Sequence, residues 1–131
     1  MTWHHCLRKT TPLQHARAVH LLRVAAEAGD LGMLSAVLHP TVQMTIDGGP
    51  TAPGPRRVRG RLDVARRMRQ VLEQLPAELS EREVNGQSGL VLKREGQVSA
   101  VVCVDVRRHR ITDVWVVLNP DKLRHWNRAA G

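Results

Sequence analysis

The chain has 131 residues, of which 42% are apolar and 2% aromatic, and it contains neither Phe nor Tyr. This length suits a single domain with an aliphatic core, and the composition excludes an active site built around tyrosine. The formal net charge is +8, but the arginines form short, scattered clusters without interleaved aromatic residues, so we do not expect direct nucleic-acid binding.

The two cysteines are too few for a disulfide framework, and Cys103 lies within an apolar run, where we interpret it as a small buried apolar residue. This cysteine usage is typical of a reducing compartment, and we expect a cytoplasmic protein. No apolar stretch reaches the ~18 residues of a membrane span, and residues 1–13 lack the apolar centre of a signal peptide.

Residues 1–10 show no periodicity and are predicted to form a disordered tail, followed by one domain over residues 11–128. Thr11, Pro12 and Gln14 have the spacing of a capping box and predict a helix start. We expect this helix to end at Gly29, where Asp30 caps a second helix that Pro40 stops. The next elements expected are a strand over residues 41–47, a loop over residues 48–55 and a helix over residues 61–75.

The second half of the chain is predicted to form a sheet. Strands are expected over residues 79–84, 90–93, 98–107 and 111–118, with a turn signal at Asn85-Gly86. A sequence of helices followed by successive strands predicts an α+β fold, with the N-terminal helices packed on a curved mixed or antiparallel sheet.

The last two predicted strands are apolar on both faces. A two-residue turn at Arg108-His109 would pair Val104 with Asp113, and Asp105 with Thr112. In an antiparallel sheet with one solvent-exposed face, apolar and polar residues alternate along each strand. These two strands do not show that alternation. Helices cover only one face, so we expect a homodimer through the other. In this register one face carries Val101, Cys103, Val114 and Val116, and the other carries Val102, Val104, Val106, Ile111, Trp115 and Val117.

The string Asn119-Pro120-Asp121-Lys122-Leu123 follows the last predicted strand. Asn119 suits a helix N-cap, Pro120 the first helical position, and Asp121 the positive end of the helix dipole. We expect Leu123 to point back at the domain and Lys122 to point outward.

Together with residues 111–118, this string resembles the C-terminal end of one group of extracytoplasmic-function RNA polymerase sigma factors, which carry a SnoaL-like domain of the nuclear transport factor 2-like fold. Asp47-Gly48-Gly49 is similar to that family's Asp-Gly-Gly-Gly loop, and the resemblance covers residues 15–126. It implies a cone-shaped α+β domain. No sigma region precedes the domain in this sequence, so we do not expect sigma activity itself. Weaker matches lie at Ala28-Gly29-Asp30-Leu31, Arg56-Arg57-Val58-Arg59-Gly60, Val84-Asn85-Gly86 and Gly96-Gln97-Val98.

The resemblance also implies that the Asp47 loop and the string at residues 119–123 face a partner in transcription. A sigma factor or an RNA polymerase subunit is the candidate partner, and a small apolar molecule is the candidate ligand. The residues assigned to ligand or partner binding on this basis are Asp47, Gly48, Gly49, Trp115, Asn119, Asp121 and Lys122.

The alternative is a small enzyme acting on an apolar molecule, because the fold also includes ketosteroid isomerases, polyketide cyclases and epoxide hydrolases. Such enzymes need a pocket carboxylate of tuned pKa. The candidates are Asp105 and Asp113, which the predicted register places on opposite faces, so that either would act alone. The adjacent residues His4-His5-Cys6 cannot all reach one tetrahedral zinc ion. We therefore expect a non-catalytic binding domain without a metal or cofactor.

Overall fold

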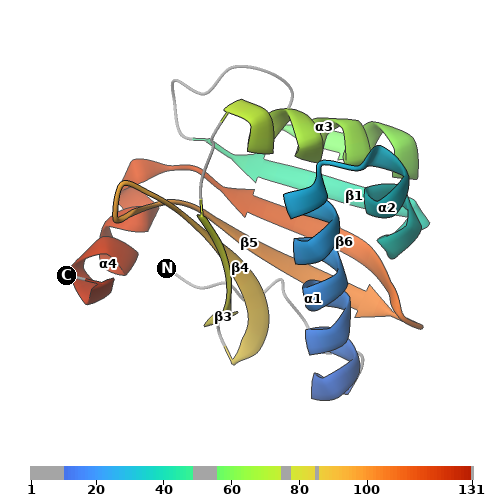
Figure 1. Ribbon diagram of the computed structural model, residues 1–131, viewed down its shortest axis with the longest axis horizontal. Coiled ribbons are helices and arrows are strands. Elements are labelled where there is room, and N and C mark those ends of the chain that lie inside the picture. Colours follow the sequence, from blue (N-terminus) through green and yellow to red (C-terminus); the bar gives the residue numbers. More distant parts are fainter. Residues whose placement is uncertain (1–10, 49–55, 75–77, 85, 131) are drawn as a thin grey trace.

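Figure 1 shows the computed structural model, which describes residues 11–48, 56–74, 78–84 and 86–130. A curved sheet of six strands forms the body of the described structure, and three helices lie along one of its faces. The α+β architecture predicted from the sequence is therefore confirmed. The predicted tail over residues 1–10 and most of the loop over residues 48–55 lie outside the described residues.

The N-terminal helices begin and end where local chemistry predicts. In α1 (Pro12–Ala28), the Thr11 side chain accepts from the backbone N–H of Gln14, and the Gln14 side chain completes the capping box. The helix stops at Gly29, whose φ of 64° lies in the left-handed region. Asp30 then caps α2 (Leu31–Val37) by accepting from the Met33 N–H at 3.1 Å.

The third helix, α3 (Arg61–Gln74), packs on the first strand and buries one face. Val64, Ala65, Met68 and Val71 are the buried apolar side chains of this helix, whereas Leu62 is 47% exposed. The predicted helix is thus confirmed over its described length.

The sheet is mixed. Its strands are β1 (Leu38–Asp47), β2 (Arg57–Arg59), β3 (Glu78–Val84), β4 (Gln87–Arg94), β5 (Gln97–Arg107) and β6 (Arg110–Val117), in the spatial order β2-β1-β6-β5-β4-β3. β1 pairs with β6 in parallel, and all other pairs are antiparallel. β2 was not expected from the sequence, and β1 begins at Leu38, three residues before the predicted start. Pro40 cannot donate to the strand ladder, and the pairing with β6 is irregular between Leu38 and Gln43.

The predicted register between β5 and β6 is wrong beyond the turn. Arg107 pairs with Arg110 and Val106 with Ile111, but Asp105 then pairs with Asp113 because Thr112 forms a bulge. A one-residue shift moves every later side chain to the opposite face. Asp105 and Asp113 therefore share a face, contrary to the prediction.

Two apolar clusters lie on the two faces of the sheet. The main core lies between the sheet and α1, α2 and α3, and it includes Val102, Val104, Val114 and Val116. The second cluster lies on the other face, where α4 (Pro120–Ala130) packs on β5. Its members are Val84, Val91, Val98, Val101, Val117 and Leu123, with Trp126 packed against them. The chain's own last helix thus covers part of the face for which we expected a partner subunit.

Cys103 lies in β5 on that second face and is 3% exposed. Its burial is confirmed, but it is disulfide-bonded, so its interpretation as a plain apolar residue is wrong. The chain's other cysteine, Cys6, lies outside the described residues. Disulfide bonds are uncommon in reducing compartments, so the cysteines do not support the expected cytoplasmic location.

Candidate functional site

The C-terminal ends of β1 and β6 are joined at Asp47. The backbone carbonyl oxygen of Asp47 accepts from the N–H groups of Leu118, at 2.7 Å, and Asn119, at 3.0 Å. These bonds continue the parallel pairing of the two strands and bring the Asp47 loop beside the start of α4. Two segments that the sequence analysis linked only by resemblance are therefore neighbours in space.

Asn119 starts α4 in the predicted way. Its side-chain oxygen accepts from the Asp121 N–H at 3.1 Å, and its carbonyl oxygen accepts from the N–H groups of Lys122 and Leu123, each at 3.1 Å. Pro120 occupies the first helical position, where its missing N–H has no consequence. The cap fixes the direction in which the next three side chains leave the helix.

Lys122 forms an ion pair with Asp47, and both side chains are 31% exposed. The side-chain N–H of Asn119 also lies 3.5 Å from the Asp47 Oδ1 atom. Lys122 therefore does not extend freely outward as expected, but holds the end of β1 against α4. Asp121 is more exposed and pairs with Arg124, one turn further along the helix.

We call this group of residues, Asp47, Gly48, Asn119, Asp121 and Lys122, the β1–α4 junction. Gly48 is half-buried next to Asp47, whereas the candidate Gly49 lies outside the described residues. Trp115 lies on β6, where it pairs with Thr45 of β1, two positions before the Asp47 pair. Six of the seven candidate binding residues therefore lie at the junction or, in the case of Trp115, two residues before it along the paired strands.

Leu123 packs between α4 and the sheet and so supports the junction. It is 4% exposed and belongs to the apolar cluster between α4 and the sheet, as predicted. Asn127, one turn further along α4, accepts from the Val98 N–H at 2.6 Å and donates to the Val98 carbonyl at 3.4 Å. Both contacts hold α4 on the sheet, so the junction rests on a fixed support.

The two candidate catalytic carboxylates lie away from the helix-covered core. Asp105 and Asp113 pair across β5 and β6, and Gln43 of β1 pairs with Asp113 on its other side. Asp105 is 9% exposed, whereas Asp113 is half-buried. Both alternate with Val104 and Val114, which point into the main core, so the carboxylates face the opposite side of the sheet.

The space between the sheet and the helices is nearly filled. A cavity of about 20 Å³ remains there, and its walls come from apolar side chains of α1, α3 and the sheet. Such a volume is far below the ~300–1,000 Å³ of typical small-molecule sites. The cavity is lined by Leu22, Ala26, Met44, Met68, Val71, Leu72, Leu79, Leu90, Leu92, Val102 and Val116.

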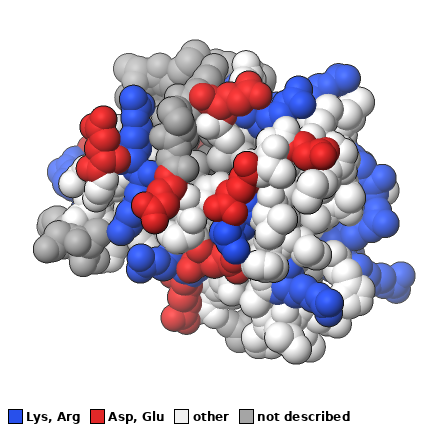
Figure 2. All heavy atoms as spheres, in the orientation of Figure 1, with Lys and Arg blue, Asp and Glu red and all other residues white. Residues whose placement is uncertain are grey.

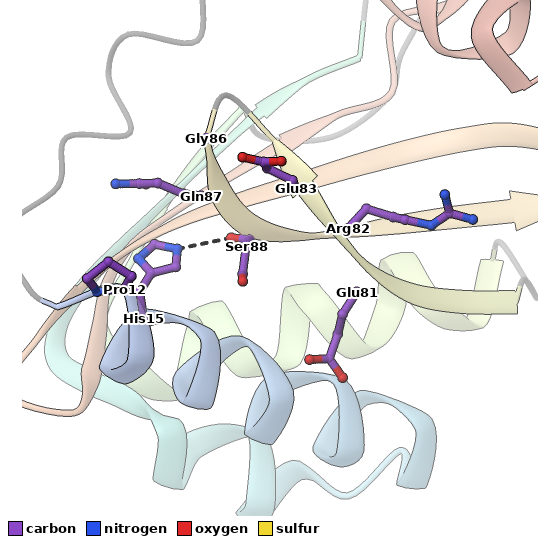
Figure 3. A pocket seen from close by; sticks show the side chains of 8 residues that line it. All are labelled: Pro12, His15, Glu81, Arg82, Glu83, Gly86, Gln87 and Ser88. Atoms are coloured by element: carbon purple, nitrogen blue, oxygen red, sulfur yellow. Dashed lines mark hydrogen bonds between the residues drawn. The ribbon is translucent and has the colours of Figure 1, made fainter.

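A larger hollow of about 300 Å³ opens between the start of α1 and the β3–β4 hairpin. Figure 3 shows the buried imidazole of His15 beside β4, where its Nε2–H donates to the Ser88 carbonyl at 3.0 Å. The carboxylates of Glu81 and Glu83 and the amide of Gln87 also line the hollow. This hollow was not expected from the sequence, because its walls come from segments about 70 positions apart and no local motif links them.

Acidic and histidine side chains are not gathered for metal binding: in the described ranges, no group of three or more His, Cys, Asp and Glu residues has a suitable arrangement. None of the described helices combines the length and apolar character needed to cross a bilayer.

Solved structures with the same fold include a sigma factor. The chain is similar to the extracytoplasmic function sigma factor SigJ of Mycobacterium tuberculosis, with 28% identity, a TM-score of 0.67 and 84% of the chain covered. It is also similar to a cystatin-like protein of Silicibacter pomeroyi, with 20% identity, a TM-score of 0.60 and coverage of 86% of this chain and 81% of that one. A proposed ketosteroid isomerase of Kribbella flavida has 15% identity and a TM-score of 0.57, with coverage of 80% of this chain and 77% of that one.

The chain spans only 44% of the length of the SigJ sigma factor. No protein-family model matches the sequence, and no curated protein matches it. At 20% and 15% identity, the other two similarities concern the fold alone. The chain therefore has the α+β fold of nuclear transport factor 2-like and cystatin-like proteins. Within that class, it resembles the C-terminal domain of an extracytoplasmic-function sigma factor.

Proposed function

We propose that the domain is a non-catalytic, regulatory binding domain that contacts a protein of the transcription machinery through the β1–α4 junction. The observation that carries this proposal is the ion pair between Asp47 and Lys122. It joins the two segments whose sequences resemble the sigma-factor domain, although they are 75 positions apart. The partner would be a sigma factor or an RNA polymerase subunit, which implies a cytoplasmic location.

The nearly filled core supports a protein partner over a small apolar ligand. A cavity of about 20 Å³ is far smaller than the ~300–1,000 Å³ of typical small-molecule sites. A ligand of ten or more heavy atoms would require the helices to move away from the sheet. The junction, in contrast, presents half-buried and exposed polar side chains on a fixed helix start.

The test of the junction is capture of partners from an extract of the native cells by the immobilised domain. We expect wild type and Lys122→Arg, which keeps the positive charge, to capture the same polymerase subunit or sigma factor. Lys122→Ala should lose most of that capture while its unfolding free energy changes by about 1 kcal/mol or less, as expected for an ion pair between partly exposed side chains.

Arg124→Ala is the matched control, because Arg124 is an exposed cation on the same helix that does not contact Asp47. It should capture partners as wild type does. If Lys122→Ala captures the same proteins in the same amounts as wild type, the junction is not the docking site.

The alternative is a small enzyme that uses Asp105 or Asp113, and one observation favours it. Their direct pairing across two strands places two carboxylates close together, which is how several enzymes separate the pKa values of an acid and a base. Under our proposal, Asp105→Asn and Asp113→Asn alter stability and leave partner capture unchanged. A turnover of an apolar substrate that either variant abolishes would favour the enzyme instead.

A further inference from the structure

The turn between β5 and β6 has an unusual backbone. Arg108 has a φ of 49° and His109 a φ of 70°, so two successive residues with bulky side chains lie in the left-handed region. Hairpin turns of this form favour Asn-Gly or Asp-Gly. The β4–β5 turn of the same chain follows that preference more closely, with Gly96 at its second position after Glu95. Turn geometry therefore does not explain Arg-His between β5 and β6.

The strained turn presents a row of basic side chains. Arg107, Arg108, His109 and Arg110 are all exposed, and Arg17 of α1 is exposed nearby. In the part of the chain that the structure describes, none of these arginines forms an ion pair. Figure 2 shows basic side chains gathered on the flank where this turn lies, with acidic side chains mainly over the middle and left of the view. Within the described chain, these arginines therefore have no acidic partner.

A groove of about 280 Å³ separates the turn from α1, and Figure 1 shows the turn beside the N-terminal half of that helix. Its helix wall is a single stripe at helical spacing, formed by Gln14, Arg17, Ala18 and Leu21, and His109 forms the opposite wall. Leu21 is 46% exposed. The groove thus combines apolar side chains with basic side chains at its edges.

We propose that this groove binds an acidic amphipathic helix of a protein partner. Apolar side chains of that helix would pack on Ala18 and Leu21, and its carboxylates would pair with Arg17 and the arginines of the turn. A nucleic acid would use the arginines but leave the leucine uncovered, and no aromatic side chain lines the groove for base stacking. The groove lies at the opposite end of β6 from the β1–α4 junction, so the two surfaces are separate.

The probe is a fluorescein-labelled synthetic helical peptide with leucines on one face and glutamates beside them, with a matched peptide in which glutamine replaces every glutamate. In fluorescence anisotropy with the full chain at low salt, we expect the glutamate peptide to bind roughly 10-fold tighter than the glutamine peptide. Salt at about 0.3 M should remove most of that difference, because it screens exposed charges.

The decisive variant is the double substitution Arg108→Asn with His109→Gly. Asn-Gly suits the turn, so this variant should melt at a higher temperature than wild type while its affinity for the glutamate peptide falls about 5-fold or more. Leu21→Gln should also weaken binding. Arg94→Gln removes an exposed basic side chain beside the β4–β5 turn and should bind as wild type does.

Three results would overturn the proposal. The first is equal affinity for the glutamate and glutamine peptides. The second is unchanged affinity in the Asn-Gly variant. The third is binding of a labelled DNA duplex by a chain that does not bind the glutamate peptide, which would make the flank a phosphate-binding surface.

Discussion

Leu123 is the side chain through which the last helix is attached to the sheet. It is 4% exposed within the apolar cluster on the second sheet face. Replacing a buried leucine by alanine removes apolar contacts and leaves a cavity, which costs about 2–5 kcal/mol. We expect Leu123→Ala to lower the unfolding free energy by about 3 kcal/mol, measured by urea denaturation. A loss similar to that of Lys122→Ala would show that α4 is not packed as described.

Thr112 illustrates how much one residue can change the interpretation of a site. Its insertion opposite a single residue of β5 places Asp113 opposite Asp105. From the sequence, the two-residue turn at Arg108-His109 was predicted correctly, and the first two pairs follow directly from its length. The bulge was not predicted, because the residues around Thr112 alternate equally well with and without it.

At the scale of elements, α1 is clamped to the edge strand β3 by ion pairs of Glu81. Glu81 Oε2 lies 3.0 Å from His20 Nδ1 and 2.5 Å from Arg23 Nε. Burial raises the pKa of Glu81, but the hydrogen bonds from Arg23 and His20 outweigh it and hold that pKa below 4.5. A carboxyl group with a lowered pKa in the folded state stabilises the fold above its unfolded pKa.

This stabilisation is lost as the pH falls through the lowered pKa. We therefore expect Glu81→Gln to lower the melting temperature slightly at pH 7, and wild type and variant to converge as the pH falls through the lowered pKa of Glu81. Thermal melts by circular dichroism from pH 3 to pH 7 measure both. A gap between the two proteins that persists unchanged to pH 3 would show that the effect is not electrostatic.

Most elements were predictable because their signals are local. The capping box at Thr11, the stop at Gly29 and the start of α4 at Asn119 each depend on residues within four positions. The strand β2 was not predictable, because it has three residues and exists only as a partner of β1. The resemblance identified the candidate residues of the junction. Their contacts could not be predicted, because these contacts form only when β1 pairs in parallel with β6.

At the scale of the whole molecule, the homodimer remains a prediction, but fewer apolar residues support it than the sequence suggested. The apolar residues Val101 and Val117, part of the basis for it, are buried within a single chain, in the cluster that α4 helps to form. Light scattering at micromolar concentration tests it: a dimer has twice the 14.7 kDa mass of the chain. A mass equal to that of one chain would mean that α4, and not a partner subunit, covers this apolar face of the sheet.

The parallel pairing of β1 with β6 also has a consequence for the order of folding. The strands β3 to β6 follow one another as antiparallel neighbours, so each pair closes a short loop. β1 must instead find β6 across most of the chain, as the 75 positions between Asp47 and Lys122 show. Closing a long loop is entropically costly and slows folding. We therefore expect the four-strand meander to form first and the segment from α1 to β1 to dock onto it late. The β1–α4 junction would be among the last contacts to form and, on unfolding, among the first to open.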